Sequence, residues 1–178
     1  MGGFFGAASK NDCVTDVFFG IDYHSHLGTK RGGMTAYSEE KGFQRAIHSI
    51  ENTPFRTKFE RVFEEMQGSS AIGCISDSDP QPLLIRSNLG TYAISTIGVI
   101  NNADELINQY LSFSGGHFDA MTSGRINSNE LIAALIDQKS SFAVFDTETR
   151  KAAVAHIVSA HIISKHQQKS NSFFPVLP

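Results

Sequence analysis

Two kinds of reactive side chain lie close together near the start of the chain, one cysteine and a pair of histidines. Cys13 precedes an apolar segment, and His24 and His26 follow that segment in a His-Ser-His sequence. Three interpretations of Cys13 compete: a thiol packed in the core, a metal ligand beside the histidines, or a nucleophile. Zinc needs three or four converging protein ligands, and no second His or Cys pair supplies the remaining ones. We therefore expect no metal site.

Catalysis by Cys13 requires a general base. A lone cysteine is most often a small buried hydrophobe, but a cysteine that opens a mature chain carries its own base. The free α-amine has a pKa of about 8, which suits proton transfer at neutral pH. Such a nucleophile needs no partner histidine. This hypothesis requires that residues 1–12 act as a leader or propeptide and are removed.

Composition limits the classes of function. The chain has 178 residues, of which 40% are hydrophobic and 19% charged, with a net charge of −3. These values are typical of a soluble globular protein, and no basic surface argues for a nucleic-acid partner. No apolar run approaches the ~20 residues that span a bilayer. Two cysteines form no disulfide framework, so we expect a cytoplasmic protein with free thiols.

The pattern of apolar and turn residues predicts the order of the elements. Asn88, Leu89 and Gly90 indicate a hairpin turn, and the sequence Asp77–Pro80 is interpreted as a turn. The predicted strands are 13–21, 34–38, 71–76, 80–88 and 89–101, and the predicted helices are 42–52, 54–68, 103–113 and 127–139. Strands followed by paired helices indicate an α+β layered fold rather than a doubly wound parallel sheet. The tail after 142 is predicted to hold a loosely attached helix and a frayed end.

Several segments resemble one family in the same order. The run CVTDVFFGI…HLGTKRGGMTAY, from Cys13 to Tyr37, resembles the N-terminal glutaminase domain of amidophosphoribosyltransferases. These are class II glutamine amidotransferases of the N-terminal-nucleophile type. AIGCISDSDPQPLLI, GTYAISTIGVINNADELINQYL and TSGRINSNELIAALI resemble later parts of that domain. The resemblance spans about Cys13 to Lys139 and implies an Ntn-hydrolase-like αββα sandwich with antiparallel sheets, here incomplete.

The resemblance also implies roles for single residues. Cys13 would attack the carboxamide of glutamine and release ammonia, and Asn101 would donate a hydrogen bond to the oxyanion, as such donors do. Arg31 and Gly32 would belong to the substrate pocket, and Asn102 would offer its main-chain N–H. No cofactor is implied for this chain. Magnesium with phosphoribosyl pyrophosphate belongs to a separate transferase domain, the partner that would receive the ammonia for purine nucleotide biosynthesis.

Departures from the family pattern leave alternatives open. An arginine that clamps the substrate carboxylate is missing where GCISDSD stands, and an aspartate is replaced near Ser128. The first hypothesis is a glutaminase-type enzyme with residues 1–12 as leader, 13–142 as the amidotransferase domain and 143–178 as a divergent tail, and a homo-oligomer is left open. The second is a binding or regulatory module that keeps the fold without a working pocket. The third is an incomplete gene product with little stable structure.

Overall fold

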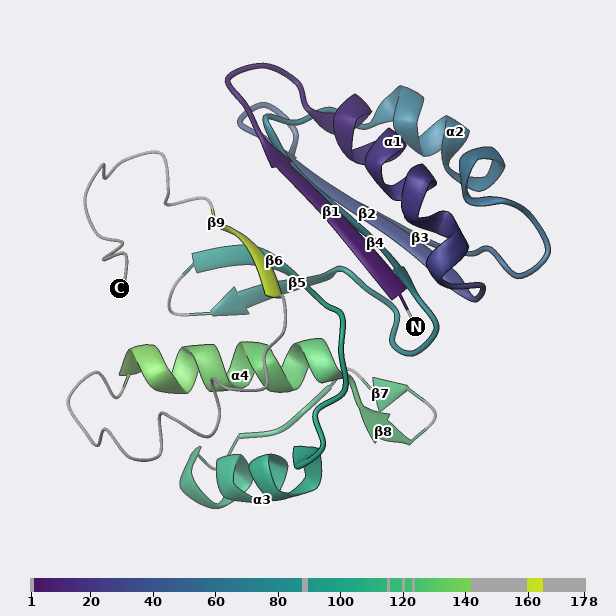
Figure 1. Ribbon diagram of the computed structural model, residues 1–178. Helices are drawn as coiled ribbons and strands as arrows, with labels where there is room; N and C mark the ends of the chain where they lie inside the picture. The colour runs from purple at the N-terminus through teal and green to yellow at the C-terminus, as the bar shows by residue number, and fades with distance from the viewer. Residues whose placement is uncertain are drawn as a thin grey trace, which may run out of the picture.

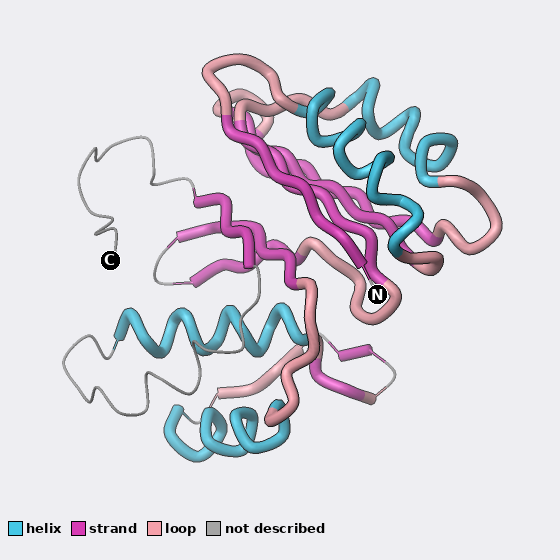
Figure 2. The backbone as a smooth tube through the Cα atoms, viewed as in Figure 1, coloured by secondary structure: helices cyan, strands magenta, loops and turns pink. Residues whose placement is uncertain are grey.

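The computed structural model describes residues 2–87, 90–114, 116–119, 121–122, 124–141 and 160–164. Two antiparallel sheets face each other and a layer of helices covers each outer side (Figures 1 and 2). Helices α1 and α2 cover the first sheet, and α4 packs on the second with α3 beyond it. The αββα layering of antiparallel sheets predicted from the sequence is therefore confirmed.

The strands belong to three sheets, and their bounds follow the chain. The first sheet contains β1 (Gly2–Ala8), β2 (Arg31–Ser38), β3 (Gly42–Ser49) and β4 (Ser70–Ser76). The second contains β5 (Leu83–Ser87), β6 (Gly90–Thr96) and β9 (Ala160–Ser164), and a small third sheet pairs β7 (Met121–Thr122) with β8 (Arg125–Ile126). The helices are α1 (Val14–His24), the short 3₁₀ turn η1 (Ser25–Leu27), α2 (Phe55–Glu65), α3 (Ala103–Ser114) and α4 (Ser128–Ser141).

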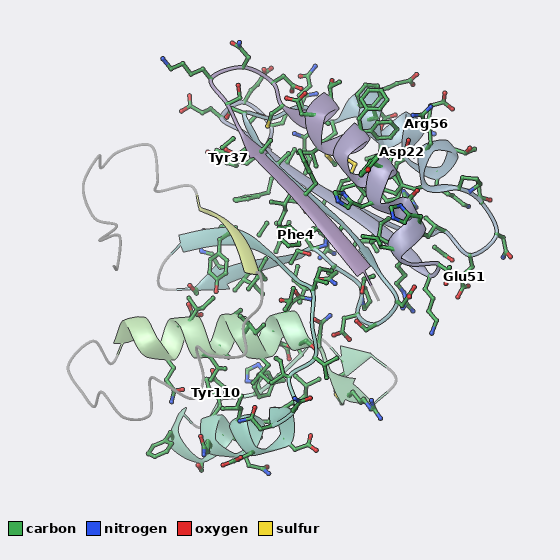
Figure 3. The ribbon with its side chains drawn as sticks, viewed as in Figure 1. Phe4, Asp22, Tyr37, Glu51, Arg56 and Tyr110 are labelled. Atoms are coloured by element: carbon green, nitrogen blue, oxygen red, sulfur yellow. The ribbon has the colours of Figure 1, made fainter. Side chains whose placement is uncertain are left out.

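The first sheet has the strand order β1-β4-β2-β3, and every neighbouring pair is antiparallel. Strand β1 pairs with β4 over seven residues, from Gly2 opposite Ser76 to Ala8 opposite Ser70. Side chains alternate between the two faces of a strand. The ring of Phe5 therefore packs over Gly20 of α1, whereas Phe4 points to the opposite face, toward the second sheet (Figure 3).

An aromatic core holds α1 and α2 on the first sheet. Phe55 and Phe59 stack with their ring centroids 4.4 Å apart, and Phe18 stacks on Phe63 at 4.7 Å. Phe55 and Phe59 are almost completely buried. On the outer surface the ion pair between Arg56 and Asp22 joins the two helices at 2.8 Å (Figure 3). Full burial of such side chains contributes about 1.5–3 kcal/mol each, so this core is the main anchor of the helix layer.

A buried glutamine connects the two sheets. The Gln81 side chain donates to the Thr96 carbonyl at 3.0 Å and accepts hydrogen bonds from the Ser95 hydroxyl and the Thr96 N–H. The main-chain carbonyl oxygen of Gln81 lies so close to Gly33 of β2 that any side chain at position 33 would collide with it. Gln81 therefore fixes the crossing from β4 to the second sheet.

Two predicted elements are wrong in type. Residues 13–21 form most of helix α1 instead of a strand, because Val14, Val17, Phe18 and Ile21 lie on one helical face that is buried on the sheet. Residues 42–52, predicted as a helix, contain strand β3. Pairing with β2 over eight residues outweighs the weak helical spacing of the segment.

Other predicted elements are confirmed. Helix α2 lies within 54–68, α3 and α4 match the two later helices, and β5 and β6 pair as the predicted hairpin arms. Asn127 caps α4, since its side-chain oxygen accepts the N–H of Asn129 at 2.9 Å. In the tail, residues 160–164 form a strand on β6 instead of a helix. The remaining predictions for 143–178 lie outside the described residues.

Candidate functional site

Cys13 lies at the start of helix α1, and its side chain is fully enclosed, with an exposed fraction of 0%. Its Sγ lies 3.5 Å from the carbonyl oxygen of Ala7 and 3.4 Å from that of Gly68. The main-chain N–H of Cys13 donates to the same Gly68 oxygen at 2.9 Å. The thiol is therefore held between the end of β1 and the segment that leads into β4.

The electrostatic surroundings of Cys13 disfavour a thiolate. Burial raises the pKa of the Cys13 thiol, and the nearby carboxylates of Asp12 and Asp16 raise it further. The thiolate is the nucleophilic form of cysteine, and reactive cysteines sit in electropositive, partly exposed surroundings. The surroundings of Cys13 are those of a structural core thiol.

The residues predicted as a leader are part of the sheet. Residues 2–8 form β1, and the connection that follows is bonded to the segment before β4. Asp12 accepts hydrogen bonds from the N–H groups of Val14 at 3.1 Å and Gly68 at 2.7 Å, and Ser9 donates its N–H to the Ser69 carbonyl at 2.8 Å. In this structure residues 2–12 supply an edge strand and the carboxylate that joins the start of α1 to Gly68.

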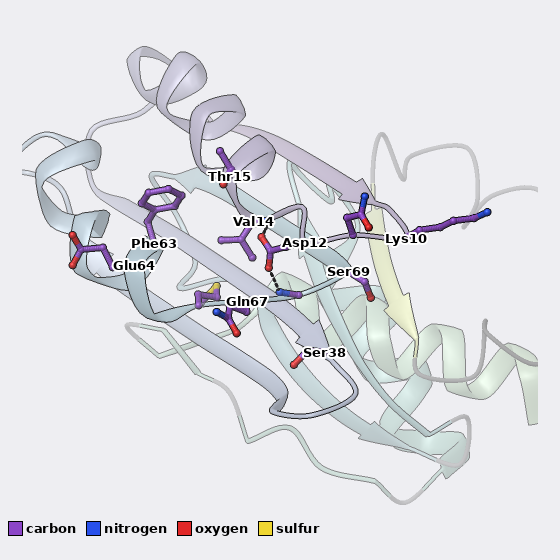
Figure 4. A pocket seen from close by; sticks show the side chains of 12 residues that line it. Lys10, Asp12, Val14, Thr15, Ser38, Phe63, Glu64, Gln67 and Ser69 are labelled. Carbon is purple, nitrogen blue, oxygen red and sulfur yellow. Dashed lines mark hydrogen bonds between the residues drawn. The ribbon is translucent and has the colours of Figure 1, made fainter.

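A surface depression adjoins this end of α1 (Figure 4). Its volume is about 480 Å³, and polar side chains such as Lys10, Thr15, Glu64 and Gln67 line it. Both oxygens of Asp12 on its wall are already engaged with main-chain N–H groups. Cys13 is not among the residues that line the depression, so the depression gives no access to the thiol.

Arg31, the second predicted site residue, lies at the other end of the sheet. It is the first residue of β2 and stands opposite Ser76, which also pairs with Gly2. Ala7, beside Cys13, is five residues further along β1, or about 17 Å away. The structure therefore separates Cys13 from Arg31 by most of the length of a strand.

Asn101 and Asn102 follow β6. Ile97, four residues before Asn101, lies beside Gly2, because a Cβ built on Gly2 would be 3.1 Å from its Cδ1. From there the chain runs away from α1 toward α3 (Figure 1). Both asparagines are exposed, and the Asn102 carbonyl accepts the N–H of Leu106 in the first turn of α3. Neither is brought to Cys13.

Gly32, predicted to line the substrate pocket, faces helix α2. A Cβ at this position would meet the Phe55 ring at 2.7 Å and the Phe59 ring at 3.1 Å. Glycine is therefore needed here for close packing of the helix on β2. The structure gives Gly32 a packing role in the aromatic core.

The segment Asp77–Pro80 ties three parts of the chain together at the Arg31 end. Asp77 accepts the N–H groups of Thr29 at 2.7 Å and Lys30 at 3.0 Å, and these bonds lower the pKa of its carboxyl. Arg31 donates to the Ser78 carbonyl at 2.8 Å. The Asp79 carboxylate accepts the N–H of Ser128 at the start of α4. The predicted turn is thus a hydrogen-bonded junction.

Sequence reasoning did not assign a role to this junction. The residue types of Asp77 and Asp79 predict only a turn, and their hydrogen-bond partners lie 47 to 49 residues away in the sequence. The predicted cap at Asn127 was the one available signal, since its amide also donates to the Pro80 carbonyl at 3.2 Å. A capped helix start beside an acidic turn is a pattern that could have suggested the contact.

Metal binding finds no support among the residues that the structure describes. They contain no group of three or more His, Cys, Asp or Glu side chains that could hold a metal ion. The histidines that follow the apolar segment bond to nearby carbonyl groups instead. The Nδ1 atom of His24 lies 2.6 Å from the Gly20 oxygen, and that of His26 lies 2.8 Å from the Tyr23 oxygen.

The chain has an Ntn-hydrolase-like αββα fold, which it shares with solved structures. The chain matches the structure of glutamine phosphoribosylpyrophosphate (PRPP) amidotransferase from B. subtilis, complexed with ADP and GMP, with a TM-score of 0.63 at 23% identity. A structure described as the allosteric regulatory enzyme of purine biosynthesis matches with a TM-score of 0.62 at 22% identity.

The extent of these matches limits what they establish. Each covers 85% of this chain but only 31% of the solved chain. No protein-family model and no curated protein matches the sequence. The resemblance inferred from the sequence is confirmed as a shared fold with amidotransferases. Among the described helices, none has the length and apolar character needed to cross a membrane.

Proposed function

We propose that this chain is a non-catalytic binding or regulatory module that keeps the glutamine amidotransferase fold. The observation that carries this proposal is the position of Cys13, enclosed behind β1 with its Sγ against the carbonyl groups of Ala7 and Gly68. A nucleophilic cysteine needs access to its substrate and a stabilised thiolate. Cys13 has neither in the folded chain.

Processing would not produce an N-terminal nucleophile without damage to the fold. Cleavage before Cys13 removes β1, which forms seven residue pairs with β4. It also removes Asp12, which accepts the N–H groups of Val14 and Gly68. The Phe5 ring over Gly20 would go with them. We therefore expect residues 2–12 to stay attached in the functional protein.

The junction at Asp77–Pro80 also supports a binding role without glutamine hydrolysis. The arginine and the aspartate that the family resemblance implies for the charged groups of glutamine are missing from this sequence. The nearby Arg31 donates to the Ser78 carbonyl, and Asp79 accepts the N–H of Ser128 at the start of α4. These groups hold the chain's own segments together, which removes strong charged contacts for an amino-acid substrate.

A covalent label separates this proposal from the enzyme hypothesis. The full chain is incubated with the glutamine mimic 6-diazo-5-oxo-norleucine, and its intact mass is measured before and after. We expect residues 2–12 to be present and no adduct to form, while a denatured sample treated with iodoacetamide gains two adducts, one for each cysteine. A chain that begins at Cys13 and gains one adduct, lost in Cys13→Ala, would overturn the proposal.

A further inference from the structure

Strand β3 forms an outer edge of the first sheet. The strand order β1-β4-β2-β3 leaves one side of β3 without a neighbouring strand in the part of the chain that the structure describes. It is also a long edge, with eight consecutive residues paired to β2 in one continuous register. An edge strand offers a row of main-chain donors and acceptors to any extended segment that approaches it.

The register shows which residues of β3 direct their main-chain groups outward. The N–H of Ile50 donates to the Lys30 carbonyl at 2.9 Å, so these two residues form an inward, hydrogen-bonded pair. Such pairs alternate along an antiparallel ladder with pairs whose groups point away from each other. The outward N–H and C=O groups on β3 therefore belong to Phe43, Arg45, Ile47 and Ser49.

The devices that usually protect an edge are sparse on β3. Natural edges carry prolines, bulges or several charged side chains, which block pairing with another chain. Strand β3 contains no proline and no break in its register. Its one charged side chain, Arg45, is turned toward the second sheet and donates to the Pro82 carbonyl at 3.4 Å. The outer side of β3 can therefore pair with another strand through its main-chain groups.

We propose that β3 pairs with β3 of a second copy of this chain, antiparallel about a twofold axis that passes beside Ala46. In this register Arg45 of one copy stands opposite Ile47 of the other, and Phe43 stands opposite Ser49. All four outward residues then take part, which gives about eight hydrogen bonds, two for each of four pairs. The two four-stranded sheets become one continuous sheet across the dimer.

Neighbouring registers are less favourable. A register centred on Arg45 places two guanidinium groups directly opposite each other, and like charges in that position are destabilising. A register centred on Ile47 leaves Phe43 outside the ladder, so only three pairs form. A twofold interface is self-complementary, and the register centred on Ala46 is the one in which every outward group of β3 meets an outward group of its copy.

A pair of cysteine variants tests the register. Facing residues in a non-hydrogen-bonded pair have Cα atoms about 4.5 Å apart, which allows a disulfide. We expect Ala46→Cys in the full chain to give a covalent dimer under mild oxidation. The control is Ser49→Cys, also on β3 and exposed, which should form no covalent dimer because the two Ser49 positions of the paired strands lie six residues apart, about 20 Å. Both native cysteines are buried.

A second comparison does not depend on oxidation. Arg45→Pro removes an outward N–H without breaking the inner ladder, as edge prolines do, whereas Arg45→Ala removes the same side chain and keeps the N–H. Thermal melts should first show that both variants unfold cooperatively at the same temperature. Light scattering should then show a dimer for Arg45→Ala and a monomer for Arg45→Pro. A wild-type chain that stays monomeric at all concentrations, or equal cross-linking of Ala46→Cys and Ser49→Cys, would overturn the proposal.

Discussion

Deletion of residues 2–12 is the perturbation that separates a removable leader from a structural strand. The deletion removes the half-buried Phe4 and Phe5 side chains, which together contribute about 2–4 kcal/mol. It also removes the two hydrogen bonds of Asp12, which together contribute about 1–2 kcal/mol. The ladder bonds of β1 are largely offset by the entropy of ordering its residues. We expect a loss of about 3–6 kcal/mol, a large part of the usual 5–15 kcal/mol.

Urea denaturation followed by circular dichroism measures this loss. With a slope of about 2 kcal/mol per molar urea, a loss of 4 kcal/mol lowers the midpoint by about 2 M. The matched control is Lys10→Ala with Asn11→Ala, two exposed residues of the same segment, which should leave the midpoint unchanged. A shortened chain that melts at the wild-type midpoint would refute the reasoning, because β1 would then be dispensable.

Three further predictions use other parts of the structure. Asp12→Ala should lower the free energy of unfolding by about 1–3 kcal/mol, because the N–H of Gly68 loses its acceptor. Urea denaturation measures this loss, with Asp16→Ala, a substitution of an exposed acidic residue of α1, as the control. Phe59→Ala should cost about 3–5 kcal/mol through the cavity left beside Phe55, and an unchanged melt would contradict this. Burial raises the pKa of Cys74 from 9.0 to about 12, so above pH 9 the unfolded chain releases a proton that the native chain keeps. Stability should then fall as pH rises, and less so in Cys74→Ser.

The sequence predicted the layered fold better than it predicted the first elements. Helix α2 has one apolar stripe and a proline before its first turn, so local and tertiary preferences agree. At 13–21 the β-branched and aromatic composition favoured a strand, although Val14, Val17, Phe18 and Ile21 have helical spacing. At β3 the pairing with β2 decides the structure, and no local pattern encodes that partner.

The site roles stay predictions, and the resemblance that implies them places the family's first strand at Cys13. The resemblance to the family's first strand led to a strand opening at that residue. In the structure the first strand is β1, from Gly2 to Ala8, and Cys13 follows it as the start of a helix. The roles assigned to Arg31 and Asn101 depend on distances between strand ends, which sequence spacing does not give.

The reactivity of Cys13 in the folded protein tests the central claim most directly. The native chain is mixed with a thiol reagent such as 5,5′-dithiobis(2-nitrobenzoic acid), and released thiolate is followed with time, beside Cys13→Ala and a denatured sample. Our account predicts negligible release from the native chain and rapid release of two equivalents after denaturation, since both cysteines are buried and free. One rapidly reacting thiol in the native wild type, absent from Cys13→Ala, would contradict it.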